Sequence, residues 1–200
     1  MKNSFVVLLG VLGLIIFIVL IGAWTAYRSY NKMVTLDEGI SSAWSQVENQ
    51  YQRRADLIPN LVNTVKGYAE FEQETLTQVI EARAKATSVN INAENLNEQT
   101  LAQFQQAQDG LSSALSRLMV VVEKYPELKA NQNFLELQAQ LEGTENRIAN
   151  ERMKFNETTK SYNVYTRKFP ATIFAGMFGF EQKPYFEAAE GAEKAPEVKF

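Results

Sequence analysis

The sequence contains no cysteine and no histidine. Without histidine it lacks the side chain that most often acts as a general base near neutral pH, and without cysteine it lacks the thiolate nucleophile. The same two residue types are the common protein ligands of zinc, copper and haem. Catalysis would have to use carboxylates, hydroxyls, lysines or an oxygen-bound metal, so we expect a protein that is not an enzyme and carries no cofactor.

The chain is also poor in clustered charge. Twenty basic residues stand against 23 acidic ones, and no basic stripe stands out, which weighs against nucleic-acid binding. The densest carboxylates, in the segment AEFEQE at residues 69–74, are two positions apart and would point to different sides of a helix. A di-metal helical bundle would need Glu-x-x-His pairs, so we interpret this segment as a solvated face rather than a metal site.

One long apolar run dominates the N-terminus. No charged side chain occurs from Asn3 to Tyr27, and a run of this length can cross roughly 30 Å of hydrocarbon as a helix. A cleaved signal peptide is the alternative, but its apolar core usually has about 7 to 15 residues and ends in small residues. We therefore predict a retained membrane anchor over residues 1–27, with a helix from Phe5 to Ala26. Its membrane-facing residues would include Phe5, Leu12, Ile16, Leu20 and Trp24.

The orientation of this anchor stays open. Lys2 and the free amino terminus flank one side, whereas Arg28 and Lys32 flank the other, so the count of positive charges is close to a tie. The sequence does not assign the following domain to either side of the membrane.

Residues 28–170 show apolar residues at steps of three and four, which is helical spacing, and no convincing alternation typical of strands. We predict an all-α fold, an elongated antiparallel four-helix bundle with helices at about 28–54, 57–87, 98–125 and 132–169. In the last helix an apolar residue recurs every seventh position, which predicts a coiled-coil-like packing seam rather than a ligand slot. That row is Phe134, Leu141, Ile148, Phe155, Tyr162 and Phe169.

The segment QRRADLIPNL, residues 52–61, predicts a corner between the first two of these helices. Asp56 would cap the second helix, and Pro59 would lie in its first turn, where a missing N–H costs nothing. Arg53 and Arg54 would close the preceding helix, where cations complement the helix dipole. The rival interpretation is one long helix kinked at Pro59, which we disfavour because an interior proline costs about 3 kcal/mol.

The C-terminal tail, residues 171–200, is apolar but broken by glycine and proline, which predicts an irregular segment. Apolar residues this dense are rarely left in water. Packing on the bundle, the membrane surface and a protein partner all remain open for Phe174, Met177, Phe178 and Phe180.

Three long stretches resemble the LemA family. They are YNKMVTLDEGISSAWSQVENQYQRRADLIPNLVNTVKGYA, then VVVEKYPELKANQNFLELQAQLEGTENRIANERMKFNETTKSYN, and finally FPATIFAGMFGF with KPYF. The resemblance implies a membrane-anchored, antiparallel helical bundle and no enzyme activity. It also implies a single-pass protein of the bacterial cell (inner) membrane, because members are widespread in bacteria.

Together these features predict a noncatalytic, membrane-anchored scaffold that self-associates into a homo-oligomer. Gly22 and Ala26 form one small-xxx-small pair inside the anchor, a weak signal for helix association in lipid. The alternative is an adaptor that binds another membrane protein, such as a protease or a transporter. In both cases the lipid bilayer is a partner and nucleic acid is not.

Overall fold

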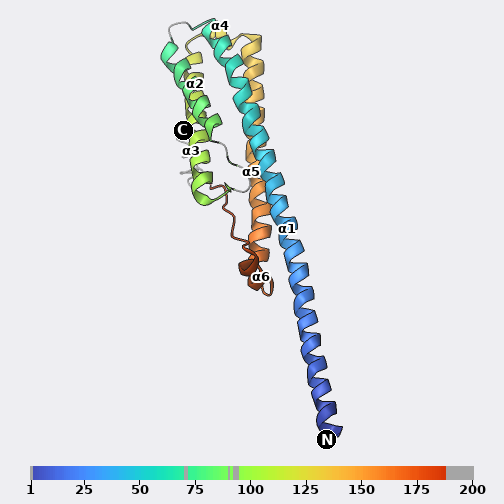
Figure 1. The fold of residues 1–200 in the computed structure, drawn as a ribbon. Coiled ribbons are helices and arrows are strands. Elements are labelled where there is room, and N and C mark those ends of the chain that lie inside the picture. Colours follow the sequence, from blue (N-terminus) through green and yellow to red (C-terminus); the bar gives the residue numbers. More distant parts are fainter. Residues whose placement is uncertain (1, 70–71, 90, 92–94, 188–200) are drawn as a thin grey trace, which may run out of the picture. The chain divides into compact units, whose positions relative to one another are not determined.

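The computed structural model describes residues 2–69, 72–89, 91 and 95–187, with side chains from residue 8 onward. Within these ranges the chain is helical and contains no strand. The helices are α1 (Lys2–Lys66), α2 (Gln73–Ser88), α3 (Glu98–Val122), α4 (Pro126–Lys129), α5 (Gln132–Arg167) and α6 (Ala171–Phe178) (Figure 1).

The chain divides into two compact units, and neither is a single continuous segment. The first unit contains Met1–Ser41 and Thr158–Gln182, and the second contains Ser42–Glu157 and Lys183–Phe200. The N-terminal part of α1, the end of α5 and α6 belong to the first unit. The rest of α1, α2, α3, α4 and most of α5 belong to the second.

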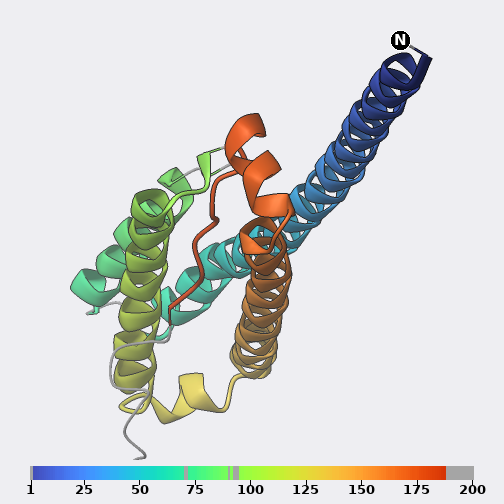
Figure 2. The same cartoon turned by 90° about the horizontal axis from the view of Figure 1, so that it is seen from below.

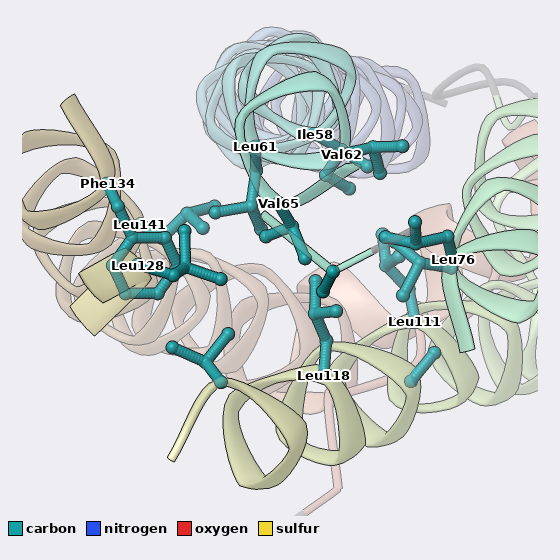
Figure 3. Packing of buried hydrophobic residues seen from close by; sticks show 14 of the residues in the cluster. Ile58, Leu61, Val62, Val65, Leu76, Leu111, Leu118, Leu128, Phe134 and Leu141 are labelled. Carbon is teal, nitrogen blue, oxygen red and sulfur yellow. The ribbon is translucent and has the colours of Figure 1, made fainter. Parts of the chain in front are cut away.

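The hydrophobic core of the second unit is built by four helical segments and the short α4. Residues at helical spacing supply it, because steps of three and four place side chains on one face of each helix. Figure 3 shows these side chains converging in the space between the helices. The buried members are Ile58, Leu61, Val62 and Val65 of α1, Ala69 beyond its end, Leu76, Val79 and Ala86 of α2, Leu111, Ala114, Leu118 and Val122 of α3, Leu128 of α4, and Phe134 and Leu141 of α5.

Helices α2 and α3 pack directly on each other, as both views show (Figures 1 and 2). The start of α3 is fixed by a capping box. The Asn97 side chain accepts a hydrogen bond from the Thr100 backbone N–H, and the Thr100 hydroxyl accepts one from the Asn97 backbone N–H. These two bonds satisfy donors that a helix start otherwise leaves free.

The structure has no corner at QRRADLIPNL, so that prediction is wrong. α1 continues through Arg53, Arg54, Asp56 and Pro59 and ends only at Lys66. Asp56 caps nothing there, since its side chain accepts a hydrogen bond from Gln52, one turn earlier in the same helix. The chain leaves helical structure after Lys66, and α2 begins at Gln73.

The continuity of α1 across Pro59 has a specific physical cause. Proline has no N–H, so the carbonyl of Ala55, four residues earlier, loses its partner inside the helix. Ala55 is buried, and an unpaired buried carbonyl would be costly. Arg83 of α2 supplies the missing donor, because its Nε donates a hydrogen bond of 2.8 Å to the Ala55 carbonyl oxygen.

The heptad row of α5 is buried from Phe134 to Tyr162, but its expected last member is not. Phe169 is 80% exposed. The reason is that α5 ends at Arg167, so the helical period that would turn residue 169 toward the core no longer applies.

Within the first unit, the Tyr162 side chain binds the backbone of the segment that follows α6. Its hydroxyl donates a hydrogen bond of 2.8 Å to the backbone carbonyl of Glu181. Burial, with smaller contributions from the carboxylates of Asp37 and Glu181, raises the pKa of the Tyr162 phenol to about 12. The phenol therefore remains protonated at neutral pH and keeps donating.

The bond between Arg83 and Ala55 predicts a thermodynamic coupling between Arg83 and Pro59. Arg83→Met should lower the free energy of unfolding by about 1–2 kcal/mol, because the Ala55 carbonyl is left without a donor. In a Pro59→Ala background the new N–H restores the intrahelical bond, and Arg83→Met should cost under about 0.5 kcal/mol. Urea unfolding of the detergent-solubilised full chain, followed by circular dichroism, measures both values.

Lys85→Met is the matched control, because Lys85 is an exposed cation on the same helix. It should give a small change of similar size in both backgrounds. Equal effects of Arg83→Met with and without Pro59 would contradict the assigned role of Arg83.

Candidate functional site

The first candidate surface is the apolar N-terminal part of α1. From Leu8 onward α1 is long and apolar enough, by length and composition, to cross a membrane. The predicted anchor residues Leu12, Ile16, Leu20 and Trp24 are between 52% and 62% exposed. Phe5 lies in α1, but its side chain is outside the described residues.

The second candidate surface is α6, in the same unit as that part of α1. The rings of Phe178 and Phe180 contact Tyr30 of α1 edge to face, with centroids 5.1 Å and 5.8 Å apart. Phe174 is half-buried, whereas Met177 is 70% exposed. The structure thus brings Phe178 and Phe180 together on Tyr30 and leaves Met177 on the outside.

The third candidate is a buried polar cluster around Arg54 in the second unit. One terminal nitrogen of its guanidinium donates to Glu145 at 2.8 Å and to the Ser112 hydroxyl at 3.0 Å. The other donates to the side-chain oxygen of Gln108 at 2.7 Å. Gln108 in turn donates to the backbone carbonyl of Ala86. This single side chain therefore links α1 to α3 and α5 directly, and to α2 through Gln108.

The chemistry of this cluster favours holding helices together rather than catalysis. A guanidinium stays protonated, so it cannot exchange a proton with a substrate at ordinary pH. Its planar fork of donors suits several fixed acceptors at once, which is what Arg54 uses it for. The other predicted corner residues, Arg53, Asp56 and Pro59, are exposed and do not join the cluster.

The fourth candidate is an aromatic cluster around Trp44, also in the second unit. The Trp44 ring meets Phe104 and Phe155 edge to face at 5.3 Å and 5.9 Å, and stacks on Phe186 at 6.0 Å. Its indole N–H donates to the carbonyl of Ile91 at 2.9 Å, which satisfies the only polar atom of a buried ring. Rings from α1, α3, α5 and the tail segment 183–187 thus share one site.

The tail segment 183–187 is held in place by α5. The Asn156 side chain accepts a hydrogen bond of 2.9 Å from the Phe186 N–H and donates one of 3.0 Å to its carbonyl. Arg152, one turn earlier, lies over the Phe186 ring at 4.7 Å and donates to the Glu187 carbonyl. Sequence reasoning missed Phe186, Asn156 and Arg152. The motif KPYF and the i, i+4 spacing of the two α5 residues were the available signals.

Tyr51 contacts both clusters, because its ring meets Phe104 edge to face and lies under the Arg54 guanidinium. Burial raises the pKa of the Tyr51 phenol, and the guanidinium groups of Arg152 and Arg54 offset part of this effect. No group of three acidic side chains close enough to hold a metal ion occurs in the part of the chain that the structure describes. Glu70 of the segment AEFEQE lies outside that part.

The tail contact gives a prediction with a matched control. Phe186→Ala should lower the free energy of unfolding by about 3–5 kcal/mol, because Phe186 is 5% exposed in a packed cluster. Phe169→Ala, at a residue that is 80% exposed, should change it by under about 0.5 kcal/mol. In a Trp24→Phe background, which leaves Trp44 as the only tryptophan, Phe186→Ala should also shift the Trp44 emission to the red. An unshifted emission would contradict the stacking.

Comparison with known proteins places the chain in a family. The sequence model of the LemA family matches residues 43–200. Magnetosome protein MamQ of Magnetospirillum gryphiswaldense is 28% identical over 195 residues, 89% of this chain and 70% of that protein. Magnetosome protein MamQ 2 of Paramagnetospirillum magneticum is 27% identical over 82% of this chain and 66% of its own length. Protein LemA of Metamycoplasma hominis is 23% identical over 80% of this chain and 69% of its own length. The chain spans about two thirds of each relative, and it belongs to the LemA family.

Proposed function

We propose that this protein is a noncatalytic, membrane-anchored helical scaffold that self-associates. The observation that carries the proposal is the composition of α1. The same helix supplies the exposed apolar stretch around Leu12 and Leu20 and the buried residues Leu61 and Val65 of the second unit's core. A bilayer removes the cost of exposing the stretch, since apolar surface in water costs about 25 cal/mol per Å².

The proposed location is a bacterial inner membrane, crossed once. One helix in the described part of the chain is long and apolar enough for a span. Trp24 and Tyr27 follow the aliphatic run and are exposed, as expected for rings that favour a membrane–water interface.

The noncatalytic part of the proposal is supported by side-chain chemistry. The sequence supplies no histidine or cysteine. The most deeply buried cation, Arg54, is engaged by Glu145, Ser112 and Gln108. The arrangement therefore suits a structural element better than a reaction centre.

The proposed architecture of the second unit is an antiparallel four-helix bundle of segments from α1, α2, α3 and α5, with coiled-coil-like packing. Two pairings support opposite directions for α1 and α2. Ala55 is bonded to Arg83, while Lys66, later in α1, lines a groove with Gln73, earlier in α2. The buried heptad row of α5 supports packing at coiled-coil spacing.

Self-association is proposed to use the face of α1 that carries Gly22. A Cβ at Gly22 would meet no other atom within 4 Å, and Ala26, one turn later, is also small, so a second helix can approach the backbone closely along this face. Gly22→Val should therefore weaken self-association several-fold. Energy transfer between donor- and acceptor-labelled full-length chains in liposomes, measured over a range of protein-to-lipid ratios, reports the change.

Gly13→Val is the matched control. Position 13 lies nine residues from position 22, which at about 100° per residue places it on the opposite side of the helix. It should leave energy transfer unchanged. A full-length chain that is monomeric at every ratio would contradict the scaffold proposal altogether.

The second candidate function is an adaptor for another membrane protein. It is favoured by a groove of about 590 Å³ between α1 and α2, with Leu76 buried at its floor and Ile80 exposed at its edge. The other residues that line it are Val62, Asn63, Lys66, Gln73 and Thr77. An amphipathic helix docks by laying its apolar face on apolar side chains, which Val62, Leu76 and Ile80 supply in this groove.

A photo-crosslinking side chain at Ile80 distinguishes the two functions in intact cells. An adaptor should give one discrete heterologous product from Ile80 and none from Val120, an exposed apolar residue on α3 outside the groove. A product of twice the chain mass would show that a second copy of the chain, and not a different protein, occupies the groove. Equal labelling from both positions would contradict the proposal that a partner binds in the groove.

A further inference from the structure

The helix α6 has an unusual side-chain distribution for a helix at a protein surface. Its sequence ATIFAGMF contains no charged residue. Ala171 and Ala175 are buried, one turn apart, whereas Ile173 and Met177 on the other side are 52% and 70% exposed. Surface helices normally turn a polar face outward, so a helix that is apolar on both sides requires a second covering.

The contacts of α6 place it just beyond the end of the membrane-spanning stretch. Phe178 and Phe180 rest on Tyr30 of α1. Tyr30 follows Ala26, the last residue of the apolar run, by four positions, or about 6 Å along the helix axis. The headgroup layer on each side of the hydrocarbon is about 5–8 Å thick. If α1 spans the membrane, α6 therefore lies at the depth of the lipid headgroups.

Most of the charged residues next to this contact in the sequence are basic, and the nearest carboxylates are Glu181, directly after Phe180, and Asp37 of α1. Arg28 and Lys32 on α1, and Arg167 and Lys168 just before α6, are all exposed. No carboxylate side chain occurs in residues 24–36 or in residues 158–180. Basic residues at this depth are attracted to the headgroups of anionic lipids, whichever side of α1 they lie on. They would repel the same residues on a second copy of the chain in a symmetric contact.

We infer that α6 is a membrane-interface helix: Ile173 and Met177 insert among the lipid headgroups beside the α1 span, and the four flanking cations bind anionic lipid phosphates. The inference rests on the proposed anchoring by α1 but not on self-association. It assigns to the exposed side of α6 a lipid surface rather than a protein partner.

The absence of cysteine makes the test direct, because one introduced thiol is the only site that reacts with a thiol-specific dye. The full-length Met177→Cys variant, carrying an environment-sensitive fluorophore, is placed in nanodiscs at one chain per disc. One set of discs contains lipids with a nitroxide quencher near the headgroup, and a second set contains lipids with the nitroxide midway along the acyl chain. Met153→Cys is the matched control, since Met153 is also an exposed methionine, on α5 in the second unit. Leu12→Cys reports whether α1 spans the disc.

The inference predicts blue-shifted emission and several-fold stronger quenching at position 177 than at position 153. Ile173→Cys, on the same exposed side, should behave like Met177→Cys. Agreement between the two variants would show that the result does not depend on one labelled position. Strong quenching at position 12 by the acyl-chain nitroxide, with equal and weak quenching at positions 177 and 153 by the headgroup nitroxide, would overturn the inference while leaving the anchoring intact. Weak quenching at all three positions would overturn both.

The role of the cations is tested by lipid composition. Quenching at position 177 should be stronger in discs of phosphatidylglycerol than in discs of phosphatidylcholine. Arg167→Gln combined with Lys168→Gln should lower the first value part of the way towards the second, because Arg28 and Lys32 remain. Equal quenching in both discs would overturn the assignment of these cations to lipid phosphates. Emission that shifts only with two chains per disc would show that a second copy, and not lipid, covers α6.

Discussion

The hydrogen bond from Arg83 to the Ala55 carbonyl is the constraint on which the second unit depends. Pro59 frees that carbonyl, which belongs to the buried residue Ala55, and α2 must present a donor to it. This requirement fixes the register of α2 along α1. Once Arg83 lies opposite Ala55, the apolar residues earlier in α2, such as Leu76 and Val79, can join the core residues later in α1.

Ala55 and its neighbour Arg54 together connect all the main segments of that unit. The backbone of Ala55 binds α2, while the side chain of Arg54 binds α3 and α5. Apolar contacts alone tolerate small shifts along a helix, because many registers bury similar area. Directional hydrogen bonds do not tolerate such shifts, so one turn of α1 specifies the register that the surrounding apolar residues then stabilise.

The parts of this fold that depend on local periodicity could be predicted from the sequence, and those that depend on distant partners could not. The row from Phe134 to Tyr162 is visible because helical spacing repeats within a few residues. The predicted corner at Pro59 was wrong because the sequence shows the cost of a proline inside a helix but not what offsets it. The offset is the hydrogen bond from Arg83, which lies in another helix. Phe186 was missed for the same reason, since Asn156, which binds its backbone, lies thirty positions earlier. The clustering of Phe178 and Phe180 on Tyr30 is likewise a product of tertiary structure.

The division into two units also limits how the gene can be cut or recombined. The chain passes from one unit to the other after Ser41, after Glu157 and after Gln182, twice within a helix. No single stretch of sequence therefore encodes either unit. A stop codon directly after Pro170 would remove α6 from the first unit and Phe186 from the second at once. The two units must accordingly be inherited, expressed and lost as one genetic module.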